Sequence, residues 1–143
     1  MILADTGFFV ALVISSDRHH AAAVDALGRY SSEGLLTTWP VLTESTHLML
    51  REGGTQVTKA FVDSVRAGAA QIFDLRARHL QRVVDLMEKY QQLPMDLADA
   101  SLIIAAEEAD DGRILSTDAR DFGAYRFKRR KPFKNLMTAP SRS

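Results

Sequence analysis

The chain has 143 residues, of which 46% are hydrophobic and 25% charged, and it contains no cysteine. This length predicts one domain that can bury a substantial core, and the lack of cysteine excludes disulfides and thiolate metal sites, so any metal must be bound by oxygen or by the four histidines. The net charge is zero, but residues 126–143 hold seven of the 18 Lys and Arg residues and no acid, which leaves residues 1–125 with a net charge of −7, a distribution compatible with a cation site and an anionic partner.

Short apolar runs predict strands that alternate with helices. Strands are expected at residues 1–5, 34–38, 70–75 and 112–117, with a fifth candidate at 135–139. Helices are expected at residues 7–14, 15–32, 39–52, 55–68, 76–93 and 96–109. In the third of these helices, Pro40 stands at the start and Gly53 is expected just after the end. This alternation is typical of an α/β domain with a mostly parallel sheet.

The apolar run at residues 8–14 is the strongest candidate for a membrane or targeting segment. It is too short to span a bilayer. No Lys or Arg precedes it, which makes it a poor signal peptide. We therefore expect a cytoplasmic protein without a membrane segment.

Acidic residues directly follow two of the predicted strands. Asp5 comes after the first strand, and Asp118 comes after the fourth. In an open parallel sheet, functional groups collect at the carboxyl ends of the strands. Both carboxylates are therefore candidates for a site at that edge.

The predicted helix at 96–109 consists almost wholly of Leu, Ile and Ala, yet Asp96 and Asp99 lie at its start. At about 100° per residue, a helical wheel places Ser101 and Glu108 on the wet side and turns Asp99 into the protein. Asp96 can cap the helix, and this role stands beside a functional one. Capping cannot explain Asp99, because a buried carboxylate needs a proton, a partner or a cation.

Glu44 lies at the margin of an apolar stripe on the helix at 39–52. Taken alone, it is explained as a solvated residue paired with His47 or Arg51. Taken together, four carboxylates can converge, and we call them the acidic quartet: Asp5, Glu44, Asp99 and Asp118. Two like charges about 5 Å apart repel by roughly 3 kcal/mol at an effective dielectric near 20, so such a cluster requires protons or cations. Sites made only of oxygen ligands suit Mg²⁺ or Mn²⁺.

Four segments in this order resemble the motifs of the PIN domain family, and most closely its VapC-type toxin ribonucleases. The segments are LADTGFFVAL, with Asp5 followed by Thr6; PVLTE, with Glu44; PMDLADASLIIAAE, with Asp99 and, one turn earlier, Asp96; and ILSTDARDF, with Thr117, Asp118, Asp121 and Phe122. The resemblance covers nearly the whole chain. In the last motif, Ala119 and Arg120 separate the two acids, where many relatives have one residue, and Asp118 is favoured over Asp121 because it directly follows the strand.

The resemblance implies one PIN-like domain over residues 1–143, with three α/β/α layers around a mostly parallel sheet of four to five strands. It implies an endoribonuclease that depends on Mg²⁺, or on Mn²⁺ as a substitute, with the acidic quartet as its catalytic metal ligands. Thr6 and Thr117 would support the ligands or contact phosphate. Relatives of this type are commonly dimeric toxins that a small antitoxin protein inhibits, so a homodimer and an antitoxin are expected. The alternative is a catalytically inactive PIN-like module that binds metal or protein.

The basic segment at 126–134 is predicted to contact RNA. Its candidate phosphate contacts are Arg126, Lys128, Arg129, Arg130 and Lys131, and Phe127 and Phe133 are expected to stack on bases. The alternative is a solvated tail that only aids solubility.

Other enzyme classes and motifs find less support. A phosphatase of the haloacid-dehalogenase-like class would need an acid where Gly7 stands, and the chain lacks both a Walker-type glycine loop and a G-x-S-x-G motif. Trp39 is expected to pack in the core or at an interface.

Overall fold

The computed structural model describes residues 1–137 and is built around a five-stranded parallel sheet. The strand order is β3-β2-β1-β4-β7, so the first strand of the chain lies in the middle. Every neighbouring pair is parallel. The strands are β1 (Ile2–Ala4), β2 (Leu35–Thr38), β3 (Gln71–Phe73), β4 (Arg113–Leu115) and β7 (Lys134–Asn135). An antiparallel hairpin joins β5 (Arg126–Phe127) to β6 (Lys131–Pro132).

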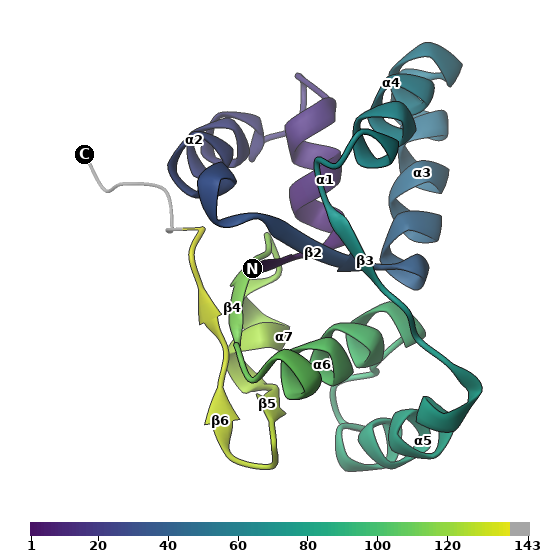
Figure 1. Cartoon of the computed structure of the whole chain (residues 1–143), viewed down its shortest axis with the longest axis vertical. Coiled ribbons are helices and arrows are strands. Elements are labelled where there is room, and N and C mark those ends of the chain that lie inside the picture. Colours follow the sequence, from purple (N-terminus) through teal and green to yellow (C-terminus); the bar gives the residue numbers. More distant parts are fainter. Residues whose placement is uncertain (138–143) are drawn as a thin grey trace.

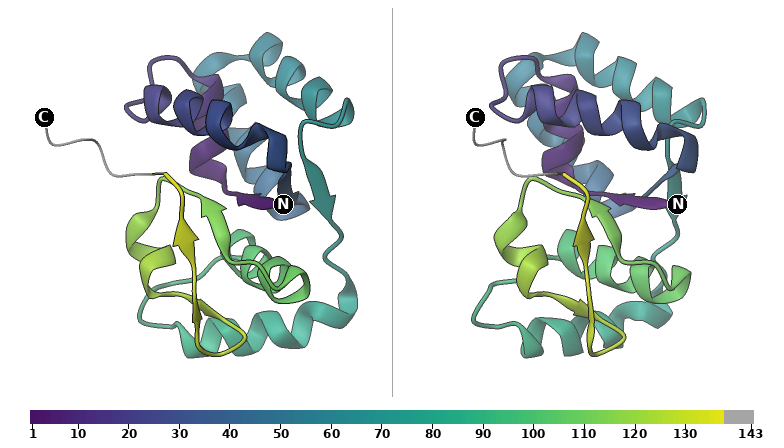
Figure 2. Two further views of the ribbon diagram at one scale, coloured as in Figure 1. Left: turned by 60° about the vertical axis from the view of Figure 1, so that its left-hand side comes forward. Right: turned by 90° about the vertical axis from the view of Figure 1, so that its left-hand side faces the viewer.

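Helices cover both faces of the sheet and make three layers (Figures 1 and 2). One layer contains α1 (Thr6–Val13), α2 (His20–Tyr30), α3 (Trp39–Gly53) and α4 (Thr55–Arg66), and the other contains α5 (Leu80–Lys89), α6 (Leu97–Ala109) and α7 (Ala119–Ala124). Two short 3₁₀ segments, Ser31–Glu33 and Ala77–His79, precede β2 and α5. Among residues 1–137, no helix has the length and apolarity needed to cross a membrane.

The predicted elements match the observed ones closely in the first 117 residues. Each of the four strands predicted there contains an observed strand, and the parallel α/β/α architecture is confirmed. The third predicted helix includes Gly53, and Gly54, with φ of 86°, ends it. The fifth strand falls at Lys134–Asn135 rather than at 135–139, and residues 138–139 lie outside the described part of the chain.

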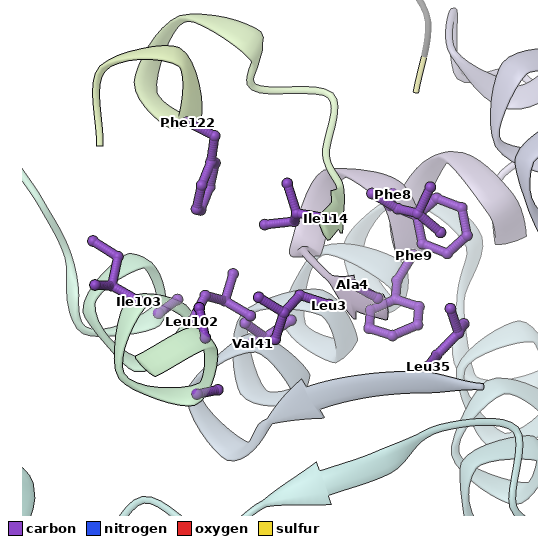
Figure 3. Packing of buried hydrophobic residues seen from close by; sticks show 14 of the residues in the cluster. Leu3, Ala4, Phe8, Phe9, Leu35, Val41, Leu102, Ile103, Ile114 and Phe122 are labelled. Carbon is purple, nitrogen blue, oxygen red and sulfur yellow. The ribbon is translucent and has the colours of Figure 1, made fainter. Parts of the chain in front are cut away.

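The hydrophobic core lies on both sides of β1 (Figure 3). Phe8 and Phe9 of α1 pack on one side, and Leu102 and Ile103 of α6 pack on the other. The α6 helix is buried almost all round, because it contacts β1, β2, α3, α5 and β5. This packing orients the helix that carries Asp99.

The predicted wet side of α6 is therefore wrong at Ser101, whose exposed fraction is 0%. Its hydroxyl donates to the carbonyl of Ala98 at 2.7 Å and shares a hydrogen bond of 2.6 Å with the hydroxyl of Thr38. Since a buried hydroxyl costs free energy unless it is hydrogen-bonded, these two bonds explain how α6 tolerates a polar residue against β2.

Candidate active site

The acidic quartet gathers at the carboxyl edge of the sheet. Asp5 follows β1 and Asp118 follows β4, and these two strands are parallel neighbours. Asp99 lies in the first turn of α6, and Glu44 lies on α3. Burial raises the pKa of both Asp5 and Asp99. The charges of Glu44 and Asp118 add to this effect at Asp5, and the charge of Asp5 adds to it at Asp99. The four side chains, whose positions span more than a hundred residues of sequence, thus lie near one edge of the sheet, within range of one another's charge.

Asp5 is the most buried of these acids, with 6% of its surface exposed. One carboxylate oxygen accepts a hydrogen bond of 2.7 Å from the backbone N–H of Thr6, and so caps α1. The other accepts a bond of 3.0 Å from the hydroxyl of Ser116. Burial raises the pKa of Asp5 to about 6, while these two hydrogen bonds act in the opposite direction. Its orientation is therefore fixed from both sides.

Ser116 is a site residue that the sequence did not reveal. Besides donating to Asp5, its hydroxyl accepts a bond of 2.9 Å from the backbone N–H of Asp118, so it connects two members of the quartet. Asn135 of β7 holds Ser116 in turn, donating to its carbonyl oxygen at 2.9 Å. The one feature of the sequence that could have indicated this role is the position of Ser116 between strand β4 and Asp118.

Asp99 is half-buried and meets Tyr125 inside the domain, although the helical wheel that turned it inward relied on Ser101 being exposed, which is wrong. Its carboxylate accepts a hydrogen bond of 3.2 Å from the hydroxyl of Tyr125, which is a second site residue that was missed. Burial raises the pKa of Asp99 to about 8, and the charges of Asp96 and Asp5 add to this effect. Burial and the charge of Asp99 also raise the pKa of Tyr125. A carboxyl with this pKa holds a proton at neutral pH unless a cation replaces it.

Asp96 caps α6, since its carboxylate accepts a bond of 2.8 Å from the backbone N–H of Asp99. This confirms the capping alternative. It does not remove Asp96 from the site, because its charge acts on Asp99. A functional role for Asp96 stays a prediction.

Asp118 caps α7 by accepting a bond of 3.1 Å from the backbone N–H of Asp121. The charge of Asp118 raises the pKa of both Asp5 and Asp99, which places it within the quartet. Burial and the neighbouring Asp118 raise the pKa of Asp121. Asp118 and Asp121 are both half-buried, and the preference for Asp118 as a metal ligand stays a prediction.

Glu44 is half-buried, and within residues 1–137 its carboxylate makes no ion pair. The suggested partner Arg51 pairs instead with Glu52 at 3.2 Å. His47 is exposed. Glu44 is therefore not explained as half of a surface ion pair.

Gly7 lets the two acid-bearing junctions touch. A Cβ at this position would overlap with Oγ1 of Thr117 and lie 3.2 Å from its Cβ. Thr117 thus packs directly on the backbone of α1, beside Asp5. Thr6 is buried, with its hydroxyl 3.5 Å from the carbonyl oxygen of Val41. The roles expected for Thr6 and Thr117 in supporting ligands or contacting phosphate stay predictions.

The residues at this edge fit Mg²⁺ or Mn²⁺ by their chemistry, because all candidate ligands are carboxylate oxygens. The geometry is less complete. In the described part of the chain, no three acidic or histidine side chains are grouped as a ready-made metal site. Asp5 is held by two hydrogen bonds, so a cation shared by the quartet would require the other acids to turn toward it.

The basic segment is a hairpin rather than a tail, and its tip lies away from the quartet. The backbone N–H of Lys128 donates to Glu107 at 2.7 Å, and the ammonium groups of Lys128 and Lys131 pair with Asp110 at 3.0 and 2.7 Å. Asp110 follows the end of α6, about 16 Å along the helix from Asp99 at 1.5 Å per residue. RNA contacts by Arg126, Lys128, Arg129, Arg130 and Lys131 stay predictions.

Phe127 belongs to the core and the half-buried Phe133 packs against it, so the expectation that both rings stack on bases is wrong. Phe127 is buried and packs on Phe133, with 5.2 Å between the ring centroids. Phe133 in turn meets Phe122 edge to face. These contacts fix the hairpin to the domain.

Comparisons with known proteins agree with this architecture. The PIN domain family profile matches residues 2–128. Ribonuclease VapC26 of Mycobacterium tuberculosis is 24% identical over 125 residues, which are 87% of this chain and 92% of that protein. The crystal structure of VapC20 from the same organism, described as a sarcin-ricin loop cleaving toxin, matches with a TM-score of 0.75 and 18% identity, over 84% of this chain and 92% of that one. The chain therefore belongs to the PIN domain family, with VapC-type toxins among its relatives.

Proposed function

We propose that this protein is a VapC-type endoribonuclease that hydrolyses RNA phosphodiester bonds with Mg²⁺ or Mn²⁺ held at the acidic quartet. The observation that carries the proposal is the convergence of Asp5, Glu44, Asp99 and Asp118 at one edge of the sheet, where burial and the charges of neighbouring acids raise the pKa values of Asp5 and Asp99. Likeness to a protein named ribonuclease VapC26 supports the reaction class.

In this proposal each acid has a definite part. Asp5, fixed by Thr6 and Ser116, is the rigid ligand, and Asp99, oriented by Tyr125, loses its proton when the cation binds. Glu44 and Asp118 complete the oxygen set. A bound Mg²⁺ would lower the pKa of a water molecule and neutralise charge on the phosphate.

The direct test is cleavage of a mixture of labelled RNAs by the purified protein with Mg²⁺ or Mn²⁺, repeated with EDTA. Cleavage is expected only with metal and only in the wild type, not in the Asp99→Asn variant. Metal binding without turnover would establish the inactive module instead. Cleavage that survives both EDTA and the substitution would contradict the proposed site.

Divalent metal is expected to raise the melting temperature, more strongly at high pH. A ligand at a hundredfold excess over its Kd stabilises the native state by about 2.7 kcal/mol, which is roughly 10 °C for a domain of this size. Because the pKa of Asp99 is about 8, protons compete with metal below that pH, so the shift should be larger at pH 8.5 than at pH 6.5. Thermal melts with Mn²⁺ measure this. Glu44→Gln should shrink the shift, and a wild type that shows none would exclude metal at the quartet.

The toxin role is part of the same proposal, with a small antitoxin protein as partner and a homodimer as the active form. Its support is the likeness to VapC20 and VapC26. Expression of the wild type should arrest bacterial growth, and the Asp99→Asn variant should not. Sedimentation of the purified protein reports the oligomeric state.

The hairpin is proposed to bind RNA phosphates outside the catalytic centre. Arg129 and Arg130 at its tip are exposed, and no acidic partner contacts either side chain within residues 1–137. The triple variant Arg129→Ala, Arg130→Ala, Lys131→Ala should bind RNA more weakly. It should also lower the salt slope by about 2, because each phosphate that is no longer neutralised reduces the slope by roughly 0.7. Metal-induced stabilisation should not change.

A matched control for the hairpin is the triple Ala variant of three exposed cations elsewhere, Arg18, Arg29 and Lys59. It removes the same charge but should leave the salt slope near that of the wild type. Equal losses of RNA affinity in the two triple variants would mean that only net charge matters, and the hairpin would be a solvated surface feature.

A further inference from the structure

Trp39 is the only tryptophan of the chain, and 56% of its surface is exposed. It is the first residue of α3 and directly follows β2. Of the two places expected for it, the core is therefore wrong, and an interface stays a prediction. A large aromatic side chain left this exposed is a common mark of a binding surface, and its place beside the candidate active site suggests what it binds.

An open surface cavity of about 700 Å³ lies between Trp39 and that site. Its walls include Trp39, His47 and Leu97, together with the acids Glu44 and Asp96. Glu44 belongs to the acidic quartet, and the charge of Asp96 acts on Asp99. A molecule bound in this cavity would therefore lie next to the quartet, so that one RNA strand could contact both the cavity and the proposed metal ligands.

The chemistry of the walls selects the part of RNA that fits. Negative charge on Asp96 and Glu44 disfavours a phosphate here, whereas the flat, neutral base can lie on the indole and on Leu97, which is 42% exposed. Aromatic side chains stack on unpaired bases in this way. A carboxylate accepts hydrogen bonds from exocyclic amino groups. The cavity thus suits a base that carries an amino group.

We propose that Trp39 and this cavity bind one unpaired nucleobase of the RNA next to the scissile phosphate, and that they favour adenine, guanine or cytosine over uracil through Asp96. The proposal rests on the proposed function and adds to it a base-specificity site. A second copy of the chain is the other occupant that an exposed tryptophan can attract, and the experiment separates the two.

Because Trp39 is the only indole, the intrinsic fluorescence of the protein reports this position alone. The Asp99→Asn variant is titrated with short single-stranded RNAs of one base type each. We expect saturable quenching, stronger for oligo-A and oligo-C than for oligo-U. Trp39→Ala should raise the KM for cleavage by about 5- to 150-fold, the range for loss of one stacked base, with kcat changed far less. Trp39→Phe should retain most of the affinity.

The matched control is Leu50→Ala, which removes an apolar side chain of similar exposure from the other end of α3. It should leave KM unchanged. The proposal is overturned if RNA quenches no fluorescence, or if Trp39→Ala cleaves RNA with the KM of the wild type. Fluorescence that depends on protein concentration without RNA, with Trp39→Ala sedimenting as a smaller species, would assign the surface to a second copy. Failure of the proposed function is distinguished from failure of this proposal by the cleavage assay. If the proposed function is wrong, the wild type with metal cleaves no RNA, whether or not oligonucleotides quench Trp39.

Discussion

Asp99→Asn is expected to abolish RNA cleavage and, without metal, to make the protein more stable. The pKa of Asp99 is raised to about 8 in the folded chain, mainly by burial. A carboxyl whose pKa is higher in the folded chain than in the unfolded chain lowers the stability of the fold as pH rises. The reason is that the unfolded chain releases a proton that the folded chain retains. Asparagine has no such proton, so the gain in melting temperature should grow as pH rises from 4 to 8.

Asp5→Asn should also abolish cleavage and raise the melting temperature without metal, and the gain in melting temperature should reach its maximum at a lower pH. Its pKa is about 6 and its burial nearly complete, so the shift of about two units corresponds to roughly 3 kcal/mol above that pH. The amide has one acceptor oxygen, and its NH2 group cannot accept, so one of the two hydrogen bonds from Thr6 and Ser116 is lost, which offsets part of this gain. A net gain of about 1–2 kcal/mol is expected.

Both variants are measured by cleavage of labelled RNA with Mg²⁺ and by melts in EDTA at several pH values. Activity should fall by at least about a hundredfold, because a ligand of the metal is lost. Asp63→Asn, at an exposed acid on α4 that pairs with Arg66, is the control and should change neither quantity much. Full activity in Asp5→Asn or Asp99→Asn would remove that residue from the site.

Gly7→Ala should destabilise the fold and lower activity, although alanine is the better helix former. In an ordinary helix the change gains about 0.5–1 kcal/mol. Here the new methyl would overlap with Oγ1 of Thr117 and lie 3.2 Å from its Cβ, and the branched Thr side chain has few rotamers that avoid the contact. Overpacking of this kind costs about 1–3 kcal/mol, so we expect a net loss of roughly 1–2 kcal/mol.

The double variant Gly7→Ala, Thr117→Ala tests the cause. Removing the hydroxyl and methyl of Thr117 leaves room for the new Cβ, so the double variant should recover most of the stability lost by Gly7→Ala alone. A double-mutant cycle from thermal melts gives the coupling between the two positions. Additive effects would show that Thr117 is not what Gly7 accommodates.

The sequence predicted the sheet and the acidic edge because both follow from local patterns. Short apolar runs mark β1, β2, β3 and β4, and an acid at the end of a parallel strand must lie at the same edge as its neighbours' ends. Asp99 was placed correctly because capping left it unexplained. These inferences need no knowledge of which side chains meet across the fold.

What sequence patterns missed depends on such meetings. Ser116 and Asp5 are 111 residues apart, and nothing local marks them as partners. Ser101 was assigned to solvent because a helical wheel does not show that β2 and α3 cover that face of α6. The segment at 126–134 was interpreted from its charge, but Phe127 is in the core and Phe133 packs on it. Lys128 and Arg129 turn the chain with positive φ.

The central position of β1 also governs when the site can exist. Its residues Ile2 and Leu3 pair with Leu35 and Leu36, but the other side of the strand stays open until Ile114 and Leu115 are available. Contacts between such distant segments form slowly, because a long loop must close first. During synthesis, Asp5 is therefore made at the start but gains its partner Ser116 only after four-fifths of the chain has followed. A ribosome-bound fragment that lacks β4 has neither the partner strand nor Asp118, and cannot assemble the quartet.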